Sequence, residues 1–232
     1  MIPSATMNRR MPAAASALLI LIGAAACTGP SASPSASAST EASSAPVSPS
    51  PSVSEPVGDR YTTTSFAVPL TVIVEPLLKS PPISDTTNLL TWDAAADDNE
   101  KIRFLIPVEV YPPGSSSPEP PPTDYLAYLQ GQASQGAQFS DVSTITVDGH
   151  AATLMTATTT ESLNGSLGCP VLGTNDPGEA CFGLQPEFIL RGAVIDMGGG
   201  TILLAWARTG FEAPDDEFNA MFERMLANLR FN

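Results

Sequence analysis

The stretch DDEFNAMFERMLANL (Asp215–Leu229) decides the fold. Its large apolar residues recur every three or four positions, which predicts one face of an amphipathic helix. Pro214 suits the first turn, and the acids at 215–217 lie at the helix's positive end. Such a helix must bury its apolar face against another layer, so we expect it to pack on a sheet. The apolar positions are Phe218, Met221, Phe222, Met225, Leu226 and Leu229.

Strand-like segments fill the sequence before this helix. Phe66–Val74 is rich in β-branched residues and predicts a strand, with Pro69 favouring an edge or a bulge. Asn88–Trp92 and Lys101–Val110 predict two more strands, separated by a turn over residues 93–100. A short helix capped by Thr123 or Asp124 is expected next. It would bury Tyr125, Leu126, Tyr128 and Leu129 before Gly136.

Two hairpins are predicted between the two helices. Asp148-Gly149 fits a two-residue type I′ turn that joins a strand over residues 142–147 to one over residues 151–160. Gly198-Gly199-Gly200 would connect strands over residues 188–196 and 201–208. No lysine followed by Ser or Thr comes after these glycines, so we interpret them as a strand connection rather than a phosphate loop.

The N-terminal segment has the order of an export signal. Arg9 and Arg10 precede an apolar run, Ala13–Ile22, and small residues at 23–26 lead to Cys27. The apolar part is shorter than the roughly 20 residues that span a bilayer. This arrangement resembles the lipobox of bacterial lipoproteins, although position 24 is alanine where leucine is usual. The resemblance implies a signal peptide over residues 1–26 and acyl chains on Cys27. A plain secretory signal is the alternative.

The segment 27–58 is rich in Ser, Pro and Ala, and it cannot bury enough apolar surface to offset its ordering entropy. We expect a disordered tether that links a lipid-anchored Cys27, on the outer side of the cell membrane, to one extracellular domain over residues 59–232. The chain's formal net charge is −14. Because nucleic-acid binding depends on clusters of Lys and Arg, no nucleic-acid partner is expected.

Cys169 and Cys181 are the remaining two of three cysteines. Outside the cytoplasm, a pair of this kind predicts a disulfide. A metal site is the alternative, but the pair lacks a nearby histidine and a CxxC spacing. We therefore expect no bound metal and no cofactor.

Catalytic patterns are weak in this sequence. The single histidine, His150, is expected to be an exposed and unoriented turn residue, and no Gly-x-Ser-x-Gly motif is present. Trp92 and Trp206 lie on predicted strands and are interpreted as core residues rather than sugar platforms.

Acidic residues between the second and third predicted strands raise the question of calcium binding. Asp93, Asp97, Asp98 and Glu100 carry hard oxygen ligands, but they lack the spacing of an EF-hand. We favour a solvated turn over a calcium site. Asn175-Asp176 is a weaker calcium candidate.

The C-terminal half supports a family resemblance. VDGHAA (Val147–Ala152), GTILL (Gly200–Leu204) and the terminal helix followed by Leu229-Arg230-Phe231 resemble actinobacterial lipoproteins with a PsbP-like fold, the LpqN-like group. The resemblance covers residues 139–232 and, more loosely, 59–110. It implies an α+β fold in which helices, including a C-terminal amphipathic helix, flank a curved antiparallel sheet. It implies an accessory or ligand-carrying role and no agreed activity.

These observations lead to one functional expectation and two alternatives. We expect a non-enzymatic, membrane-tethered binding or accessory domain that presents a concave face to an unknown protein, lipid or small ligand. An extracellular hydrolase that uses paired carboxylates is the first alternative. A purely structural envelope protein is the second.

Overall fold

The structure is a computed structural model that describes residues 57–174 and 176–232. The predicted signal peptide, Cys27 and all of the predicted tether before Val57 lie outside the described residues, as does Asn175. Within the described part, none of the helices combines the length and the apolar character needed to cross a membrane.

A seven-stranded antiparallel sheet is the centre of the described domain, with strand order β3-β4-β5-β11-β10-β7-β6. A three-stranded sheet, β1-β2-β12, and a two-stranded sheet, β8-β9, accompany it. The fold is therefore α+β and antiparallel, as the sequence predicted. The strands are β1 Asp59–Thr62, β2 Leu70–Val74, β3 Ser84–Asp85, β4 Leu89–Asp93, β5 Lys101–Leu105, β6 Ala137–Val147, β7 His150–Thr159, β8 Leu163–Gly168, β9 Phe182–Leu184, β10 Phe188–Gly198, β11 Thr201–Gly210 and β12 Arg230–Phe231.

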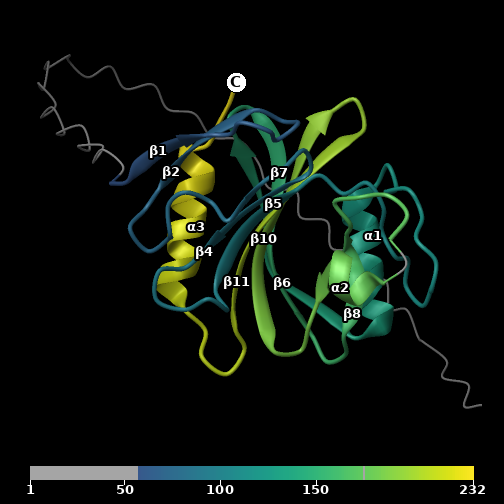
Figure 1. Ribbon diagram of the computed structural model, residues 1–232. Helices are drawn as coiled ribbons and strands as arrows, with labels where there is room; N and C mark the ends of the chain where they lie inside the picture. The colour runs from purple at the N-terminus through teal and green to yellow at the C-terminus, as the bar shows by residue number, and fades with distance from the viewer. Residues whose placement is uncertain (1–56, 175) are drawn as a thin grey trace, which may run out of the picture. The chain divides into compact units, whose positions relative to one another are not determined.

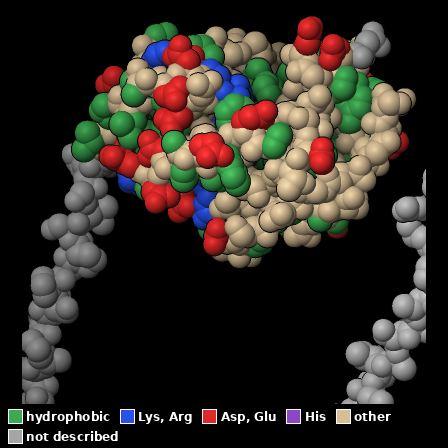
Figure 2. All heavy atoms as spheres, turned by 90° about the horizontal axis from the view of Figure 1, so that it is seen from below, with side chains coloured by type: hydrophobic (Ala, Val, Ile, Leu, Met, Phe, Trp, Pro, Cys, Tyr) green, Lys and Arg blue, Asp and Glu red, His purple; other side chains and the backbone are tan. Residues whose placement is uncertain are grey.

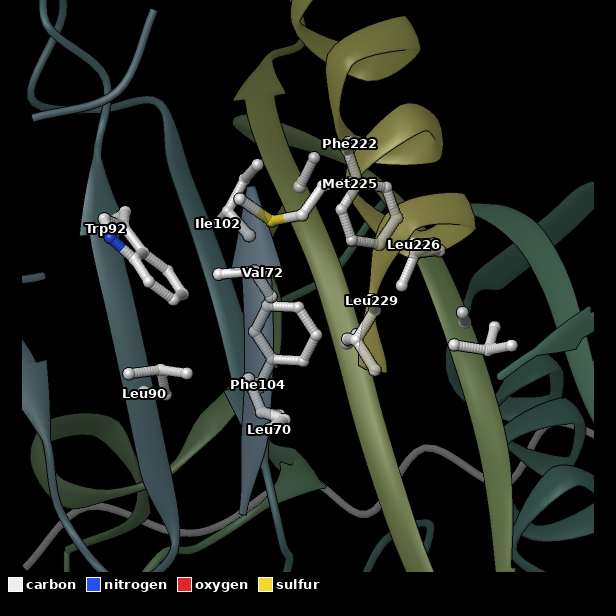
Figure 3. Packing of buried hydrophobic residues seen from close by; sticks show 14 of the residues in the cluster. Leu70, Val72, Leu90, Trp92, Ile102, Phe104, Phe222, Met225, Leu226 and Leu229 are labelled. Carbon is white, nitrogen blue, oxygen red and sulfur yellow. The ribbon is translucent and has the colours of Figure 1, made fainter. Parts of the chain in front are cut away.

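Helix α3 (Asp216–Asn228) covers one face of the large sheet together with β1 and β2 (Figure 1). Asp215 caps the helix by accepting a hydrogen bond from the backbone nitrogen of Phe218 at 2.8 Å. Its apolar side packs against the sheet, where Phe222 and Met225 lie close to Phe104 of β5 (Figure 3). The prediction that the terminal helix packs on a sheet is confirmed.

The opposite face carries the remaining helices (Figure 1). These are α1 (Tyr125–Gly131), the 3-10 helix η1 (Gln132–Gln135) and the short α2 (Pro177–Ala180). Asp124 caps α1, as predicted, by accepting from the backbone nitrogen of Ala127 at 2.9 Å. Tyr125 and Leu129 of α1 join a second apolar core on this face, in which the large sheet contributes Trp206.

Alternation along the central strands separates the two cores. On β11, Leu203 and Ala205 belong to the core under α3, whereas Leu204 and Trp206 belong to the core on the α1 side. This is the expected consequence of side chains pointing alternately to the two faces of a strand. Each central strand therefore supplies both cores.

Both predicted hairpins are confirmed. Asp148 (φ 45°) and Gly149 (φ 85°) have the positive φ angles that a type I′ turn requires, between β6 and β7. Strands β10 and β11 pair antiparallel across Gly198–Gly200. The hairpins are longer than predicted, because β6 extends back to Ala137.

Two predicted strands are shorter in the structure. The first, predicted over Phe66–Val74, begins only at Leu70. The preceding residues instead form a loop, since the Asp85 carboxylate accepts hydrogen bonds from the backbone nitrogens of Thr64, Ser65 and Phe66. The strand predicted over Lys101–Val110 ends at Leu105, ahead of Pro107.

Strand β6 is an edge strand with a bulge. Its register with β7 shifts between Ser140 and Ser143, and Asp141 has a positive φ of 51°. Arg191 of β10 holds the bulge in place: it donates to the Asp141 carbonyl at 3.3 Å and to Glu223 of α3 at 2.7 Å. The bulge is thereby tied to the helix that covers the sheet.

Candidate ligand-binding cleft

Arg103 is the residue around which the candidate site is built. It lies in the middle of β5, where its neighbours Ile102 and Phe104 are fully buried in the core under α3. Strand alternation therefore directs Arg103 to the opposite face of the sheet. On that face it is in register with Trp206 of β11.

Two aromatic rings lie beside the Arg103 guanidinium. Its central carbon lies 4.9 Å from the centroid of the Phe182 ring and 5.9 Å from that of the Trp206 ring. These are cation–π distances, and the two rings also contact each other edge-on with centroids 5.5 Å apart. Among the described residues, Arg103 has no side-chain hydrogen bond and no carboxylate partner within ion-pair distance.

A second arginine lies beside the first. Arg208 of β11 places its guanidinium carbon 4.1 Å from the centroid of the Phe188 ring, and its Nε donates to the Asn99 carbonyl at 2.8 Å. Burial lowers the pKa of Arg208. Burial, followed by repulsion from Arg208, lowers the pKa of Arg103 to about 10. Both side chains thus remain cationic at neutral pH.

The two arginines line a cleft of about 390 Å³, which we call the Arg103 cleft. This volume falls in the range of roughly 300–1,000 Å³ that is typical of small-molecule sites. The walls combine apolar and aromatic side chains with the amides of Asn164 and Gln185, which hydrogen-bond to each other at 2.7 Å. The cleft is lined by Arg103, Asn164, Leu167, Gly178, Glu179, Cys181, Phe182, Gly183, Gln185, Phe188, Leu190, Trp206 and Arg208.

The predicted disulfide forms one wall of the cleft. Cys169 and Cys181 are bonded, which confirms the prediction, and Cys181 lines the cleft directly before Phe182. The enclosed loop contains the short helix α2, which is capped by Asp176, an acceptor from the Gly178 backbone nitrogen at 3.0 Å. The disulfide therefore anchors the residue directly before Phe182 to the end of β8.

His150 is oriented, contrary to the sequence-based expectation. Its Nδ1 lies 3.1 Å from the Asp196 carbonyl, and its ring meets Phe231 edge-on with centroids 5.0 Å apart. The reason is that the C-terminal strand β12 passes beside the β6–β7 turn, where Asp148 accepts a hydrogen bond from the Phe231 backbone nitrogen at 2.8 Å. The contacts of His150 are structural.

In the acidic turn after β4, Asp97 and Asp98 are exposed, whereas Asp93 and Glu100 are only partly exposed. Asp93 pairs with Lys101, and Asp98 pairs with Lys79. Asp97 accepts from the Asn99 backbone nitrogen at 2.8 Å. Within the described ranges, no group of three or more His, Cys, Asp or Glu side chains is arranged to hold a metal ion. Asp176 is committed to its helix cap.

A second cleft, of about 380 Å³, contains two acids. It lies between the start of α1 and the glycine turn after β10, and it is lined by Asp124 and Asp196 among others. Asp124 caps α1, and Asp196 accepts from the Gly198 backbone nitrogen at 2.8 Å. Both carboxylates are therefore engaged by the backbone.

Acidic residues outnumber basic ones in this chain, with 24 Asp and Glu against 10 Lys and Arg. Figure 2 shows acidic side chains spread over the face seen from below, with basic side chains only in isolated places. Five of the cations pair with a carboxylate: Lys79, Lys101, Arg191, Arg224 and Arg230. The absence of such a partner distinguishes the two cleft arginines from these five.

The solved structures that resemble this domain share little sequence with it. One is the solution structure of cyanobacterial PsbP (CyanoP) from Synechocystis sp. PCC 6803, with 11% identity and a TM-score of 0.41 over 81% of this chain and 100% of that chain. Another is the Ran-binding protein Mog1p of Saccharomyces cerevisiae, with 9% identity and a TM-score of 0.42 over 75% of this chain and 96% of that chain. No family model and no curated protein matches the sequence. At these TM-scores neither likeness carries a functional argument.

Sequence reasoning did not find the Arg103 cleft. Trp92 and Trp206 were expected in the core, and both are at most 2% exposed. That Trp206 would lie opposite an arginine depends on the β5–β11 register, which no local pattern encodes. The one available signal was an arginine between buried apolar residues in KIRFL (Lys101–Leu105), which marks a charge on the inner side of a strand.

Proposed function

We propose that this chain is a non-enzymatic binding or accessory domain that takes a small ligand in the Arg103 cleft. The observation that carries the proposal is the Arg103 guanidinium, which lines the cleft beside two aromatic rings and contacts no carboxylate among the described residues. Arg103 is only partly exposed to water, and a partly desolvated cation without a contacting carboxylate is costly. Such a group is a candidate for a functional role, which here is ligand binding.

We further propose that the domain works outside the cytoplasm, tethered through acyl chains on Cys27. The order of residues before Cys27 supports export, and the Cys169–Cys181 disulfide fits an oxidising compartment. Two acyl chains would suffice for stable anchoring. The PsbP-like, LpqN-like resemblance of the C-terminal half agrees with an accessory role and stays part of this proposal.

Hydrolysis by paired carboxylates receives less support. It requires two acids that are available to a substrate in one cleft. Asp124 and Asp196 line a common cleft, but each already accepts a backbone hydrogen bond. We therefore propose binding rather than turnover.

Native mass spectrometry of the protein purified from the cells that make it tests the binding proposal. A ligand should co-purify with the parent protein and should be lost from Gln185→Trp, which fills the Arg103 cleft from its rim. Gln138→Trp is the matched control, since Gln138 is exposed on β6 and lines none of the clefts described above. A ligand retained equally by both variants, or missing from the parent, would contradict the proposal.

Cell fractionation tests the anchor separately. Cys27→Ala should move the protein from the membrane fraction to the medium. If the variant fractionates with membranes as the parent does, the lipid anchor is wrong, whereas the binding proposal is unaffected.

A further inference from the structure

We infer that the ligand of the Arg103 cleft is a small organic monoanion, a carboxylate attached to a flat apolar body. The carboxylate pairs with Arg103, and the apolar body lies against Phe182 and Phe188. This inference rests on the proposed function, because it names the chemical class of ligand for the same site.

The charge pattern gives the first argument. With a net charge of −14, the chain as a whole repels anions, and its carboxylates could have supplied a partner to every arginine. Arg103 and Arg208 instead lie side by side in one cleft, close enough for Arg208 to lower the pKa of Arg103. Arg60 also has no carboxylate partner, but it is exposed on β1, where water solvates it. A ligand carboxylate would supply the direct ion-pair partner that Arg103 lacks among the described residues, where the acids nearby lie beyond ion-pair distance.

The geometry of Arg103 gives the second argument. Aromatic rings interact with the flat faces of a guanidinium, and the rings of Phe182 and Trp206 stand at cation–π distances from Arg103. No described side chain or backbone carbonyl accepts a hydrogen bond from its N–H groups. The fork of N–H groups matches the two oxygens of a carboxylate.

The walls of the cleft define the rest of the ligand. Phe182 and Phe188 are the partly exposed aromatic residues of the lining, and a flat apolar body can pack against their rings. The cleft also has an acid, the exposed Glu179 of α2. Its negative charge disfavours a ligand that carries several negative charges, such as a nucleotide or a polyphosphate. A ligand with a single negative charge can pair with Arg103 and is repelled by Glu179 less than a ligand with several negative charges.

Calorimetric titration with 2-naphthoate and its neutral counterpart 2-naphthamide tests the inference. We expect 2-naphthoate to bind the parent protein at least about 10-fold more tightly than the amide does. Arg103→Met keeps much of the apolar stem but removes the charge, and it should weaken 2-naphthoate binding about 10- to 100-fold while leaving the amide unaffected. Arg103→Lys should give an intermediate loss, because it keeps the charge without the fork.

Arg60→Met is the control, since it changes the net charge by the same amount at an exposed site away from the cleft. Its affinity for 2-naphthoate should stay within about twofold of the parent value. Circular dichroism checks that each variant folds. If Arg103→Met does not fold, the inference is tested by Arg103→Lys and by the ratio of the 2-naphthoate and 2-naphthamide affinities of the parent protein.

Two results would overturn the inference. One is 2-naphthoate binding that is absent at millimolar concentration or no tighter than that of the amide. The other is an equal loss in Arg103→Met and Arg60→Met, which would indicate bulk electrostatics. If native mass spectrometry finds a neutral or cationic ligand that Gln185→Trp loses, the proposed function stands and only this inference fails.

Discussion

The Phe182 ring lies over the Arg103 guanidinium, with 4.9 Å between the ring centroid and the guanidinium carbon. Phe182 directly follows Cys181, the second half-cystine of the disulfide. The covalent link between the end of β8 and the start of β9 thus lies next to a ring that contacts the proposed ligand-binding arginine. The disulfide that closes the loop and Phe182 of the proposed ligand site are therefore adjacent in the chain.

Removal of the disulfide should weaken both the fold and the cleft. Cys169→Ala/Cys181→Ala frees the loop over residues 170–180, and the loss of this cross-link should lower the free energy of unfolding by about 3 kcal/mol. The Phe182 ring should lose its fixed position, and 2-naphthoate affinity should fall by at least about threefold. Urea unfolding and calorimetry measure the two effects. Unchanged affinity in a folded, disulfide-free protein would show that the loop does not position Phe182.

Asp85 should make stability depend on pH at the acidic end. Burial alone would raise the pKa of this carboxyl, but hydrogen bonds from Thr64, Tyr61 and Ser65 outweigh it and lower the pKa below its usual value. A lowered native-state pKa adds stability that is complete above the unfolded pKa of about 3.9 and is lost as pH falls through the native-state pKa. Asp85→Asn should therefore cost about 1–3 kcal/mol at pH 7 and reduce the acid-dependent slope.

Urea unfolding between pH 2 and pH 7 measures this effect. Glu212→Gln is the matched control, because Glu212 is an exposed acid that takes part in none of the hydrogen bonds described here. The assignment to Asp85 fails if the two variants show the same slope. The partner of Asp85 gives a second readout at the alkaline end: burial and the hydrogen bond to Asp85 raise the pKa of Tyr61 to about 12, so Asp85→Asn should return tyrosinate formation at this residue toward pH 10.

Truncation of the buried face of α3 should be among the costliest changes. Phe222 is fully buried between the helix and the large sheet (Figure 3). Phe222→Ala should lower the free energy of unfolding by about 3–5 kcal/mol, since it leaves a cavity in the core. Glu217→Gln, on the exposed side of the same helix, should cost less than about 1 kcal/mol. Guanidinium unfolding of both variants checks the difference, and similar costs would contradict the packing of α3.

Two glycines with open space around them should respond oppositely to alanine. A Cβ at either Gly149 or Gly131 would meet no atom within 4 Å. Gly149 has a φ of 85° in the type I′ turn, so Gly149→Ala should cost about 1–2 kcal/mol of backbone strain. Gly131 ends α1 in ordinary helical geometry, so Gly131→Ala should be neutral or stabilise by up to about 1 kcal/mol. Thermal melting of both variants is the measurement, and a loss of the same size in both would rule out this explanation.

Local patterns were sufficient to predict most elements of this fold. The apolar repeat of α3, the Asp124 cap and the Asp148-Gly149 turn each depend on neighbouring residues, and the structure has all three. Errors arose where a distant residue decides the outcome. The prediction that a strand starts at Phe66 was wrong, because Asp85, about twenty residues later, binds the backbone of Phe66 and holds it in a loop.

In the candidate site too, features that depend on neighbouring residues were predictable and features that depend on distant residues were not. The disulfide was predictable from the number of cysteines and the expected compartment, whereas the Arg103 cleft required the register between β5 and β11. His150 was expected to be unoriented because nothing near it in sequence indicates that Phe231 would pack against it. Residues joined by tertiary contacts are those for which a single sequence gives the weakest signal.

The bulge at Asp141 has a consequence for the behaviour of the protein in concentrated solution. A long, straight edge strand such as β6 would otherwise offer its unpaired backbone groups to a neighbouring molecule, which could add another strand and begin a growing fibre. The extra residue interrupts the even spacing of those groups, and Arg191 keeps it from straightening. At the opposite edge, β3 is only two residues long and offers little to pair with. Both edges of the large sheet therefore offer little to a strand from a neighbouring molecule when the protein is crowded.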